Sequence, residues 1–351
     1  MARQPAPAVP AAVITGIGAC LPPRAVGNDE IARGLDTSDA WIRARIGIRE
    51  RRHVDPPTST GDLAVQAGRL ALKADGDSRV DAVVLTSTTP DWNFCPATAP
   101  AVAARLGLGG VGAFDVTAAC SGFLYSLSLA SGLIAAGTAR RVLVIGAETL
   151  SLIRDPLDRN TAAILGDGAG AVVLRAGERA EPGAVGPCVL GSDGDLAELL
   201  QVPAGGSRQR SAGTVPDRAD RYLRMRGKET YRHAVQRMRQ ASLDALERTG
   251  WDLADVDRLA AHQANARICD SVAEKLGIEP ERRLANIDRV GNTGAASIPL
   301  LLAESALSGA LRPGHRSLLV AFGSGLTWAA TTLVWPDVTA LTETAAQDDP
   351  R

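Results

Sequence analysis

The chain has 351 residues, of which 45% are hydrophobic and 22% are charged, a composition typical of a folded globular protein and unlike that of a disordered chain. A net charge of -1 and an aromatic content of 3% favour neither electrostatic attraction of nucleic acid nor base stacking. Five scattered cysteines and four histidines predict no disulfide framework and no metal site, and no stretch has the pattern of a membrane span or a signal peptide. We therefore expect a cytoplasmic protein without a nucleic-acid partner, a membrane partner or a metal.

Short runs rich in Val and Ile alternate with longer helical stretches, which predicts an α/β fold. The clearest strands are Ala12–Ile17, Ala82–Thr86, Val142–Ile145 and Ser317–Phe322. The clearest helices are Gly61–Ala74, Ala99–Leu106, Gly122–Ala136, Thr230–Thr249 and Ala266–Leu276. A Pro- and Ala-rich head (residues 1–11) is predicted to be disordered, and an acidic tail (residues 337–351) is predicted to be flexible.

Four short segments recur in the same order at a nearly constant distance along the chain. Two recur after 170 residues (64 to 234, 106 to 276) and two after 176 residues (80 to 256, 142 to 318). This predicts two similar α/β halves, residues 12–177 and 178–336, although coincidence in a chain rich in Ala, Leu and Val is the alternative. Superposing the halves sets Thr86 opposite His262 and Cys120 opposite Asn292. A site between the halves, beyond the strand carboxyl ends, is therefore expected.

Cys120 follows a predicted strand and a turn of small residues, and it precedes an apolar helix that begins at Gly122. A cysteine at a helix N-terminus lies near unsatisfied N–H groups and the positive end of the helix dipole, which favour its thiolate. The sequence therefore makes Cys120 a candidate nucleophile. A buried structural cysteine is the competing interpretation.

Three other segments could contribute chemistry. His262 stands at the end of a predicted strand, and Asn292 lies in a polar turn before a helix, although both residue types also serve structural roles there. The turn Phe322–Thr327 could aim backbone N–H groups at an oxyanion or be a plain turn. The glycines of Gly166–Gly170 do not have dinucleotide-binding spacing, so we interpret them as a tight strand connection.

Together these motifs resemble the β-ketoacyl-acyl carrier protein synthase III family over residues 12–336. The resemblance rests on Thr37–Ile42, Gly47–Arg51, Thr117–Phe123, Asp158–Thr161, Gly166–Gly170, His262–Asn265, Gly291–Thr293 and Phe322–Trp328. It implies a thiolase-like fold with two similar α/β halves in a layered α-β-α-β-α architecture. The family's fold duplication would account for the internal recurrence.

The resemblance also implies roles for individual residues. Cys120 would accept an acyl group, His262 and Asn292 would complete the triad, and the backbone N–H groups of Cys120 and Ser324 would form the oxyanion hole. The residues expected to contact coenzyme A are Thr37, Trp41, Arg159 and Arg267. Acyl-CoA would be a substrate, and no cofactor is implied.

Two positions depart from the family pattern in a way that predicts a larger acyl pocket. Cys95 stands where the family often has a bulky aromatic residue that reaches across a homodimer, and Leu165 stands where phenylalanine is common. The pocket is therefore expected to favour branched or larger acyl groups over acetyl. The segment Gln201–Asp220 is longer than a minimal loop, and the sequence assigns it no role.

A positive region is expected to dock the acidic carrier protein. Residues 201–240 contain ten basic and three acidic side chains, a balance of +7 in a chain with a net charge of -1. Arg232, Arg267 and Lys275 match positions where the family places docking residues, although Glu274 stands where a second base is common. A solvated Arg-rich loop is the alternative.

The implied reaction is a decarboxylative Claisen condensation, in which Cys120 takes an acyl group from acyl-CoA and malonyl-acyl carrier protein then supplies the attacking carbon. It would start fatty acid or polyketide chains. One alternative is acyl transfer to an alcohol or amine, but members that do so often lack the Asn retained here at position 292. A papain-like protease and a non-catalytic binding protein are two further alternatives, which the motifs disfavour.

Overall fold

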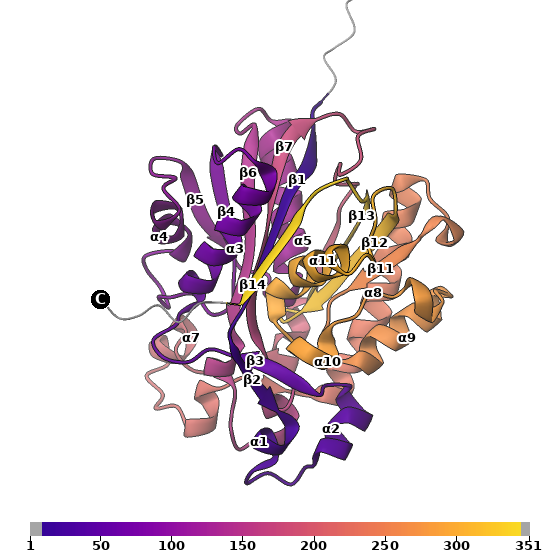
Figure 1. Ribbon diagram of the computed structural model, residues 1–351. Coiled ribbons are helices and arrows are strands. Elements are labelled where there is room, and N and C mark those ends of the chain that lie inside the picture. The colour runs from indigo at the N-terminus through magenta and orange to yellow at the C-terminus, as the bar shows by residue number, and fades with distance from the viewer. Residues whose placement is uncertain (1–8, 345–351) are drawn as a thin grey trace, which may run out of the picture.

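Residues 9–344 are described by a computed structural model, in which two β-sheets lie side by side with helices between and around them (Figure 1). The strands of the first half of the chain are β1 (Ala11–Leu21), β2 (Arg24–Gly27), β3 (Glu50–His53), β4 (Ala82–Thr86), β5 (Gly112–Val116), β6 (Arg141–Thr149) and β7 (Asp167–Gly177). Its helices are α1 (Asn28–Ala32), α2 (Asp39–Ile46), α3 (Thr60–Asp75), α4 (Thr98–Arg105), α5 (Gly122–Ala135) and α6 (Arg159–Ala162).

The second half has the same alternation of strands and helices. Its strands are β8 (Val189–Ser192), β9 (Leu200–Gln201), β10 (Arg224–Met225), β11 (Arg258–Ala261), β12 (Arg316–Gly323), β13 (Thr327–Val334) and β14 (Ala340–Thr344). Its helices are α7 (Ser207–Ser211), α8 (Gly227–Thr249), α9 (Ala266–Leu276), α10 (Ile287–Val290) and α11 (Ser297–Leu307).

The two large sheets repeat one strand order, which confirms the predicted duplication of the fold. The first sheet runs β14-β1-β7-β6-β4-β5, and the second runs β11-β12-β13-β8. In each, two neighbouring parallel strands are followed by two antiparallel pairings: β4–β6, β6–β7 and β7–β1 in the first, and β11–β12, β12–β13 and β13–β8 in the second. A parallel bridge between Leu259 and Arg283 stands where β5 pairs with β4.

Helices complete a layered α-β-α-β-α arrangement. The helices α3 and α4 pack on the outer face of the first sheet, α8 and α9 cover the second, and α5 and α11 lie between the sheets (Figure 1). Because α5 and α11 meet a sheet on either side, both are apolar over most of their surface. Their side chains, including Phe123, Leu127 and Leu300, belong to the largest buried apolar cluster.

The chain ends differ from prediction. Ala340–Thr344 is not a flexible tail but strand β14, which pairs in parallel with β1 at the sheet edge; its Thr and Glu side chains suit an edge strand with exposed residues. Residues 345–351 and most of the predicted disordered head lie outside the described residues, and Ala11 already begins β1. None of the helices in residues 9–344 is both long and apolar enough to cross a membrane.

Candidate active site

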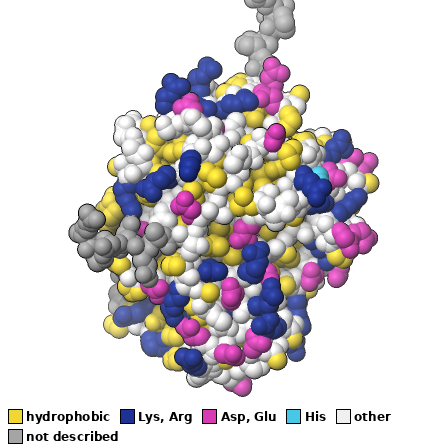
Figure 2. Space-filling model, in the orientation of Figure 1, with side chains coloured by type: hydrophobic (Ala, Val, Ile, Leu, Met, Phe, Trp, Pro, Cys, Tyr) yellow, Lys and Arg dark blue, Asp and Glu magenta, His cyan; other side chains and the backbone are white. Residues whose placement is uncertain are grey.

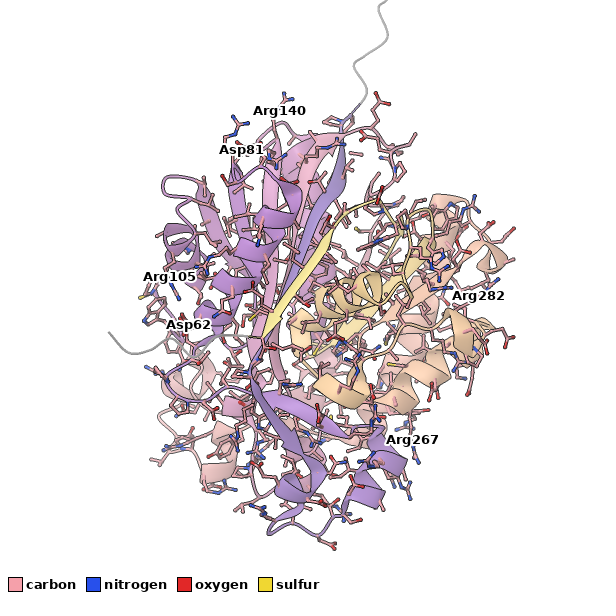
Figure 3. The ribbon with its side chains drawn as sticks, in the orientation of Figure 1. Asp62, Asp81, Arg105, Arg140, Arg267 and Arg282 are labelled. Atoms are coloured by element: carbon pink, nitrogen blue, oxygen red, sulfur yellow. The ribbon has the colours of Figure 1, made fainter. Side chains whose placement is uncertain are left out.

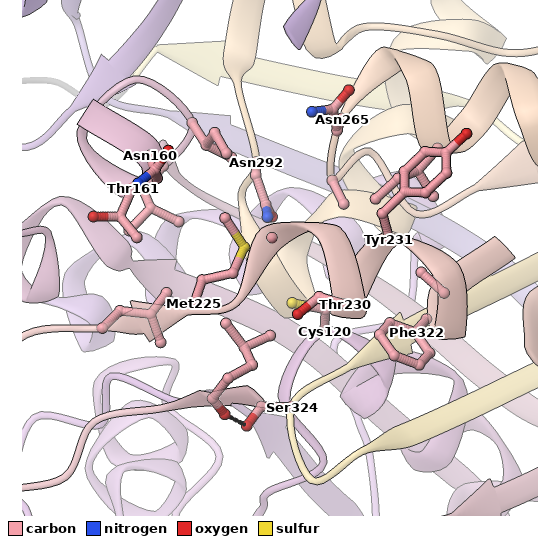
Figure 4. A pocket seen from close by; sticks show the side chains of 18 of the residues that line it. Cys120, Asn160, Thr161, Met225, Thr230, Tyr231, Asn265, Asn292, Phe322 and Ser324 are labelled. Carbon is pink, nitrogen blue, oxygen red and sulfur yellow. Dashed lines mark hydrogen bonds between the residues drawn. The ribbon is translucent and has the colours of Figure 1, made fainter. Parts of the chain in front are cut away.

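One cavity of about 1190 Å³ lies where the carboxyl ends of strands from both sheets meet. Cys120, His262, Asn292 and Ser324 all line it, together with Phe322 at the end of β12. Figure 4 shows Cys120, Asn292 and Ser324 around the same space. The structure therefore brings together the four residues that the sequence predicted for the catalytic centre, at the predicted place between the halves.

Cys120 is held in a tight approach of two backbones. It sits in a short 3₁₀ turn, Ala119–Ser121, that leads into α5, and Ala119 before it has a left-handed φ of 45°. On the other side, a Cβ added to Gly323 would lie 2.6 Å from the Cys120 nitrogen. Only glycine at position 323 allows the turn after β12 to come this close to the nucleophile.

The thiol of Cys120 is neutral in this environment. Burial and the nearby Glu148 carboxylate raise the pKa of Cys120 to about 12, although its own backbone N–H works in the opposite direction. The sequence predicted that the helix start would favour the thiolate, but the loss of solvation outweighs that effect. With its pKa raised in this way, the thiol is the main form of Cys120 near pH 7.

His262 follows β11 directly and is buried, and its backbone N–H donates to the Val320 carbonyl across the strand pair at 2.8 Å. Burial lowers the pKa of His262 to about 3, so its imidazole is neutral near pH 7 and carries one N–H. Among the described residues its Nδ1 has no hydrogen-bond partner. A neutral imidazole with a free ring nitrogen can donate or accept a hydrogen bond but is a weak base.

Asn292 presents a fixed donor to the cavity. Its Oδ1 accepts from the Gly294 backbone N–H at 2.9 Å, so the amide nitrogen is the free end, and Figure 4 shows that nitrogen pointing toward Cys120. The backbone of Asn292 pairs with the Ile164–Gly166 segment through bonds of 2.9 and 2.8 Å. These backbone hydrogen bonds therefore hold Asn292 and the segment around Leu165 together as one rigid unit.

The turn after β12 is fixed by its own side chains and by a contact with β9. The Ser324 hydroxyl donates to the Leu200 carbonyl (Figure 4), and Thr327 Oγ1 lies 3.0 Å from the carbonyl oxygens of Ala118 and Ser324, between which its single proton is shared. Because its hydroxyl is engaged in this way, Ser324 can offer only its backbone N–H to a substrate oxygen.

The cavity mouth carries an aromatic ring and several cations. Trp41 and Arg159 both line it, with the Arg159 guanidinium 5.2 Å from the Trp41 ring centre, and Arg267 lies nearby with its guanidinium on the Ala44 carbonyl. Thr37 does not line the cavity. Sequence reasoning missed Arg45, which lines the mouth one helical turn after Trp41 on α2; the i, i+4 spacing could have identified it.

The inner wall of the cavity is apolar and includes Leu165 as predicted. Cys95 is exposed and does not line the cavity of its own chain. The long segment that follows β9 begins and ends beside the cavity. Its two ends are joined by the β9–β10 pair, which places Leu200, Gln201 and Met225 on the cavity wall. Other apolar lining residues that the sequence did not identify are Leu150, Ile153, Val202, Leu223 and Met238.

The positive region is less positive than the sequence indicated. Arg232 and Arg267 are exposed beside the cavity and Lys275 is exposed on α9, and Figure 3 shows Arg267 at the surface near α2. Four of the ten basic residues of positions 201–240 form ion pairs, two of them with Asp155 and Asp193, which lie outside that range. Acidic and basic side chains are also intermixed on the face in Figure 2.

Glu148 is the polar residue at this site that the sequence did not identify. It is fully buried near the end of β6, close enough to Cys120 to raise the pKa of that thiol. Within residues 9–344, no group of three or more His, Cys, Asp or Glu side chains is arranged to hold a metal ion.

Cysteine, histidine and asparagine side chains in one cavity, at the junction of two duplicated α/β halves, are the arrangement expected of a condensing enzyme of the thiolase fold. Residues 114–194 match the 3-oxoacyl-[acyl-carrier-protein] synthase III family, and residues 246–335 match its C-terminal region. The chain is 57% identical over 330 residues to beta-ketoacyl-[acyl-carrier-protein] synthase III 3 of Streptomyces coelicolor, covering 93% of this chain and 98% of the relative. The chain belongs to this synthase III family.

Further similarities agree. The beta-ketoacyl-[acyl-carrier-protein] synthase III of Pseudomonas aeruginosa is 49% identical, with 93% of this chain and 98% of the relative covered. The crystal structure of 3-oxoacyl-(acyl carrier protein) synthase III from Pseudomonas aeruginosa PAO1 superposes with a TM-score of 0.87 at 47% identity, covering 94% and 99% of the two chains. The priming β-ketosynthase of the R1128 polyketide pathway gives 0.86 at 33%, covering 96% and 99%. The chain is thus an acyl-transferring ketosynthase of fatty acid or polyketide biosynthesis.

Proposed function

We propose that Cys120 carries the acyl group and that this chain condenses an acyl-CoA with malonyl-acyl carrier protein. The convergence of Cys120, His262 and Asn292 on one cavity is the observation that carries the proposal. In the first step the Cys120 sulfur bonds to the acyl carbonyl and the bond to coenzyme A breaks. The thiol proton ends on the departing coenzyme A sulfur; His262, whose pKa is lowered by burial, stays neutral and serves as a hydrogen-bond partner in this step.

In the second step malonyl carrier protein enters the same cavity. Its carboxyl carbon leaves as carbon dioxide, and the electron pair forms a thioester enolate whose oxygen accepts hydrogen bonds from His262 and Asn292. The enolate carbon attacks the acyl carbonyl on Cys120, and the tetrahedral oxyanion is held by the backbone N–H groups of Cys120 and Ser324. Collapse breaks the bond to the Cys120 sulfur and leaves a β-ketoacyl carrier protein; the released thiolate takes a proton from water to restore the neutral thiol.

The side chains at the cavity mouth and on the surface beside it support acyl-CoA and malonyl-acyl carrier protein as the substrates. Trp41, Arg45, Arg159 and Arg267 combine a stacking surface with cations that suit an adenine ring and its phosphates. Thr37, half-buried and away from the cavity wall, would act only indirectly. Arg232, Arg267 and Lys275 remain the proposed contacts for the acidic carrier protein, with no cofactor needed beyond the acyl-CoA substrate.

The acyl group is proposed to be larger than acetyl. Leu165 in place of an aromatic ring, on a wall with Met225 and Met238, supports a pocket with room for a branched or medium-length chain. The preference should be graded, because one methylene discriminates by only about 1–3 kcal/mol in an apolar pocket.

We also propose a homodimer in the cytoplasm, where all five cysteines would remain the free thiols seen in the structure. The outer edge of β5 is unpaired among the described strands, and the loops after β4 and β6 expose Phe94 and Leu157 (68% exposed). Pairing of two β5 edges would cover these side chains and bring Cys95 toward the partner. Light scattering should give twice the chain mass of 36.4 kDa, and a monomer would contradict the proposal.

One experiment separates the candidate functions. The full-length protein is incubated with acetyl-CoA and with longer or branched acyl-CoAs, each with and without malonyl carrier protein, and all products are followed by mass spectrometry. Formation of acylated enzyme and β-ketoacyl carrier protein is the expected result. Acylated enzyme that gives no condensation product but acylates an added alcohol or amine would favour the acyltransferase alternative.

A further inference from the structure

Glu148 is a buried carboxylate at the catalytic centre that the two reaction steps do not use. Its side chain is fully buried, and within the described residues no basic side chain forms an ion pair with it. Burying a carboxylate without a counter-ion is costly unless hydrogen bonds replace its hydration. The hydrogen-bond donors around Glu148 therefore identify the parts of the chain that its carboxylate holds in place.

On one side Glu148 binds the turn that follows β4. Its Oε2 accepts from the hydroxyls of Ser87, Thr88 and Thr89 at 3.2, 2.9 and 2.8 Å, and the Thr88 backbone N–H donates to it at 3.1 Å. The Thr89 hydroxyl itself accepts from the Thr149 N–H, so its proton is free for Glu148. Backbone N–H groups can only donate, so the carboxylate is an acceptor here. Thr88 in turn lines the cavity.

On the other side Glu148 faces the turn that fixes Asn292. Its Oε1 accepts a long hydrogen bond of 3.4 Å from the Ala295 N–H. A Cβ added to Gly294 would lie 3.0 Å from both the Cγ and the Oε1 of Glu148, so the backbone at this position rests on the carboxylate. The Gly294 N–H is the donor that holds Asn292 Oδ1. A shift of Glu148 would therefore move the group that directs the Asn292 amide.

From this geometry we infer that Glu148 is a positioning residue for the condensation step: it clamps the Ser87–Thr89 and Gly294–Ala295 turns together and so keeps the Asn292 amide nitrogen directed at the substrate. This inference rests on the proposed function, in which Asn292 serves the enolate and not the first acyl transfer. Glu148 should accordingly matter more for condensation than for acylation of Cys120.

Burial raises the pKa of Glu148, while the hydrogen bonds from Thr88, Thr89 and Ala295 act in the opposite direction and stabilise the ionised form. The charge of that ionised form provides an independent readout. The carboxylate contributes to the raised pKa of the Cys120 thiol, second to burial, whereas His262 is neutral and the cations of the cavity (Arg45, Arg159, Lys228, Arg232 and Arg267) lie at the mouth. Removing the charge should therefore let Cys120 react with iodoacetamide at lower pH than in the wild type. A residue that only supports the fold would not move that profile.

The test compares Glu148→Gln with Glu148→Asp. Glutamine keeps the shape but loses the charge and one acceptor oxygen; aspartate keeps the charge but retracts from Ala295. In Glu148→Gln we expect the condensation rate to fall about 10- to 100-fold, less than the roughly 10²- to 10³-fold cost of removing an oxyanion donor outright, because Asn292 is displaced and not lost. Acylation by acyl-CoA should change less than about threefold, and the alkylation profile should shift to lower pH. In Glu148→Asp the condensation rate should again fall more than the acylation rate, while the alkylation profile stays near that of the wild type.

Asp81→Asn is the matched control. Asp81 caps the start of β6, where its carboxylate accepts from the N–H groups of Arg140 and Arg141 at 2.7 and 2.9 Å, at the end of the strand far from the cavity (Figure 3). This variant should lower stability without changing the ratio of condensation to acylation. Equal losses of both rates in both Glu148 variants, or an unshifted alkylation profile in Glu148→Gln, would overturn the inference. A wild-type protein that takes no acyl group would instead overturn the proposed function.

Discussion

Replacing Gly323 by alanine tests how closely the two backbones at the catalytic centre must approach. The added Cβ would lie 2.6 Å from the Cys120 nitrogen, 3.1 Å from the Ala119 Cβ and 3.2 Å from the Ser121 nitrogen. Ordinary contact begins near 3.4 Å, so the turn and the nucleophile must separate by about 0.8 Å. The same shift would stretch an oxyanion hydrogen bond of about 2.9 Å beyond hydrogen-bonding distance.

The expected cost follows from that displacement. Losing one oxyanion donor lowers the rate about 10²- to 10³-fold, and overpacking of this kind costs about 1–3 kcal/mol of stability. Acylation of Cys120 would be timed by intact-mass analysis and folding checked by thermal unfolding. Gly132→Ala is the control, because this position in α5 has open space around it; the substitution should leave the rate unchanged and stability equal or slightly higher. A folded Gly323→Ala protein with the wild-type acylation rate would refute the reasoning.

Three further results are expected. Burial lowers the pKa of His53 to about 4, so between pH 6.5 and 4 the unfolded chain binds more protons than the folded one, and the free energy of unfolding falls as the pH drops. In denaturant titrations, His53→Gln should reduce the slope of unfolding free energy against pH by about 1.4 kcal/mol per pH unit. An unchanged slope would exclude His53 as its source. Leu165→Phe should shift the preference toward acetyl-CoA in competition assays, and a larger preference for long chains would contradict the pocket assignment. Arg232→Glu should raise the apparent KM for malonyl carrier protein while leaving acylation by acyl-CoA nearly normal, and salt should mimic it; an unchanged KM at low and high salt would leave this patch as ordinary surface.

Local signals in the sequence predicted the duplicated fold and three candidate catalytic side chains. The four strands and five helices named from apolar periodicity match elements of the structure to within a few residues, and Cys120, His262 and Asn292 line one cavity. β14 was missed because its Thr and Glu residues resemble a solvated tail, and only pairing with β1 makes them a strand.

The other differences come from contacts between distant parts of the chain. Glu148 lies in an ordinary Gly-Ala-Glu-Thr sequence, and its burial becomes evident only when the turns after β4 and before α11 close over it. In the same way, Asp155 and Asp193 neutralise Arg218 and Arg237 from outside the Arg-rich segment. The neutral Cys120 thiol likewise depends on burial, which no local pattern around the residue indicates.

The most direct test of the central claim is the mass of the intact protein after brief incubation with acyl-CoA, followed by addition of malonyl carrier protein. The account predicts one added acyl group on the wild-type chain, none on Cys120→Ala, and loss of that group with formation of β-ketoacyl carrier protein in the second stage. In Asn292→Ala the acyl group should remain on the enzyme, with condensation slowed about 10²- to 10³-fold. Acylation that persists in Cys120→Ala, or condensation at the wild-type rate in Asn292→Ala, would contradict the account.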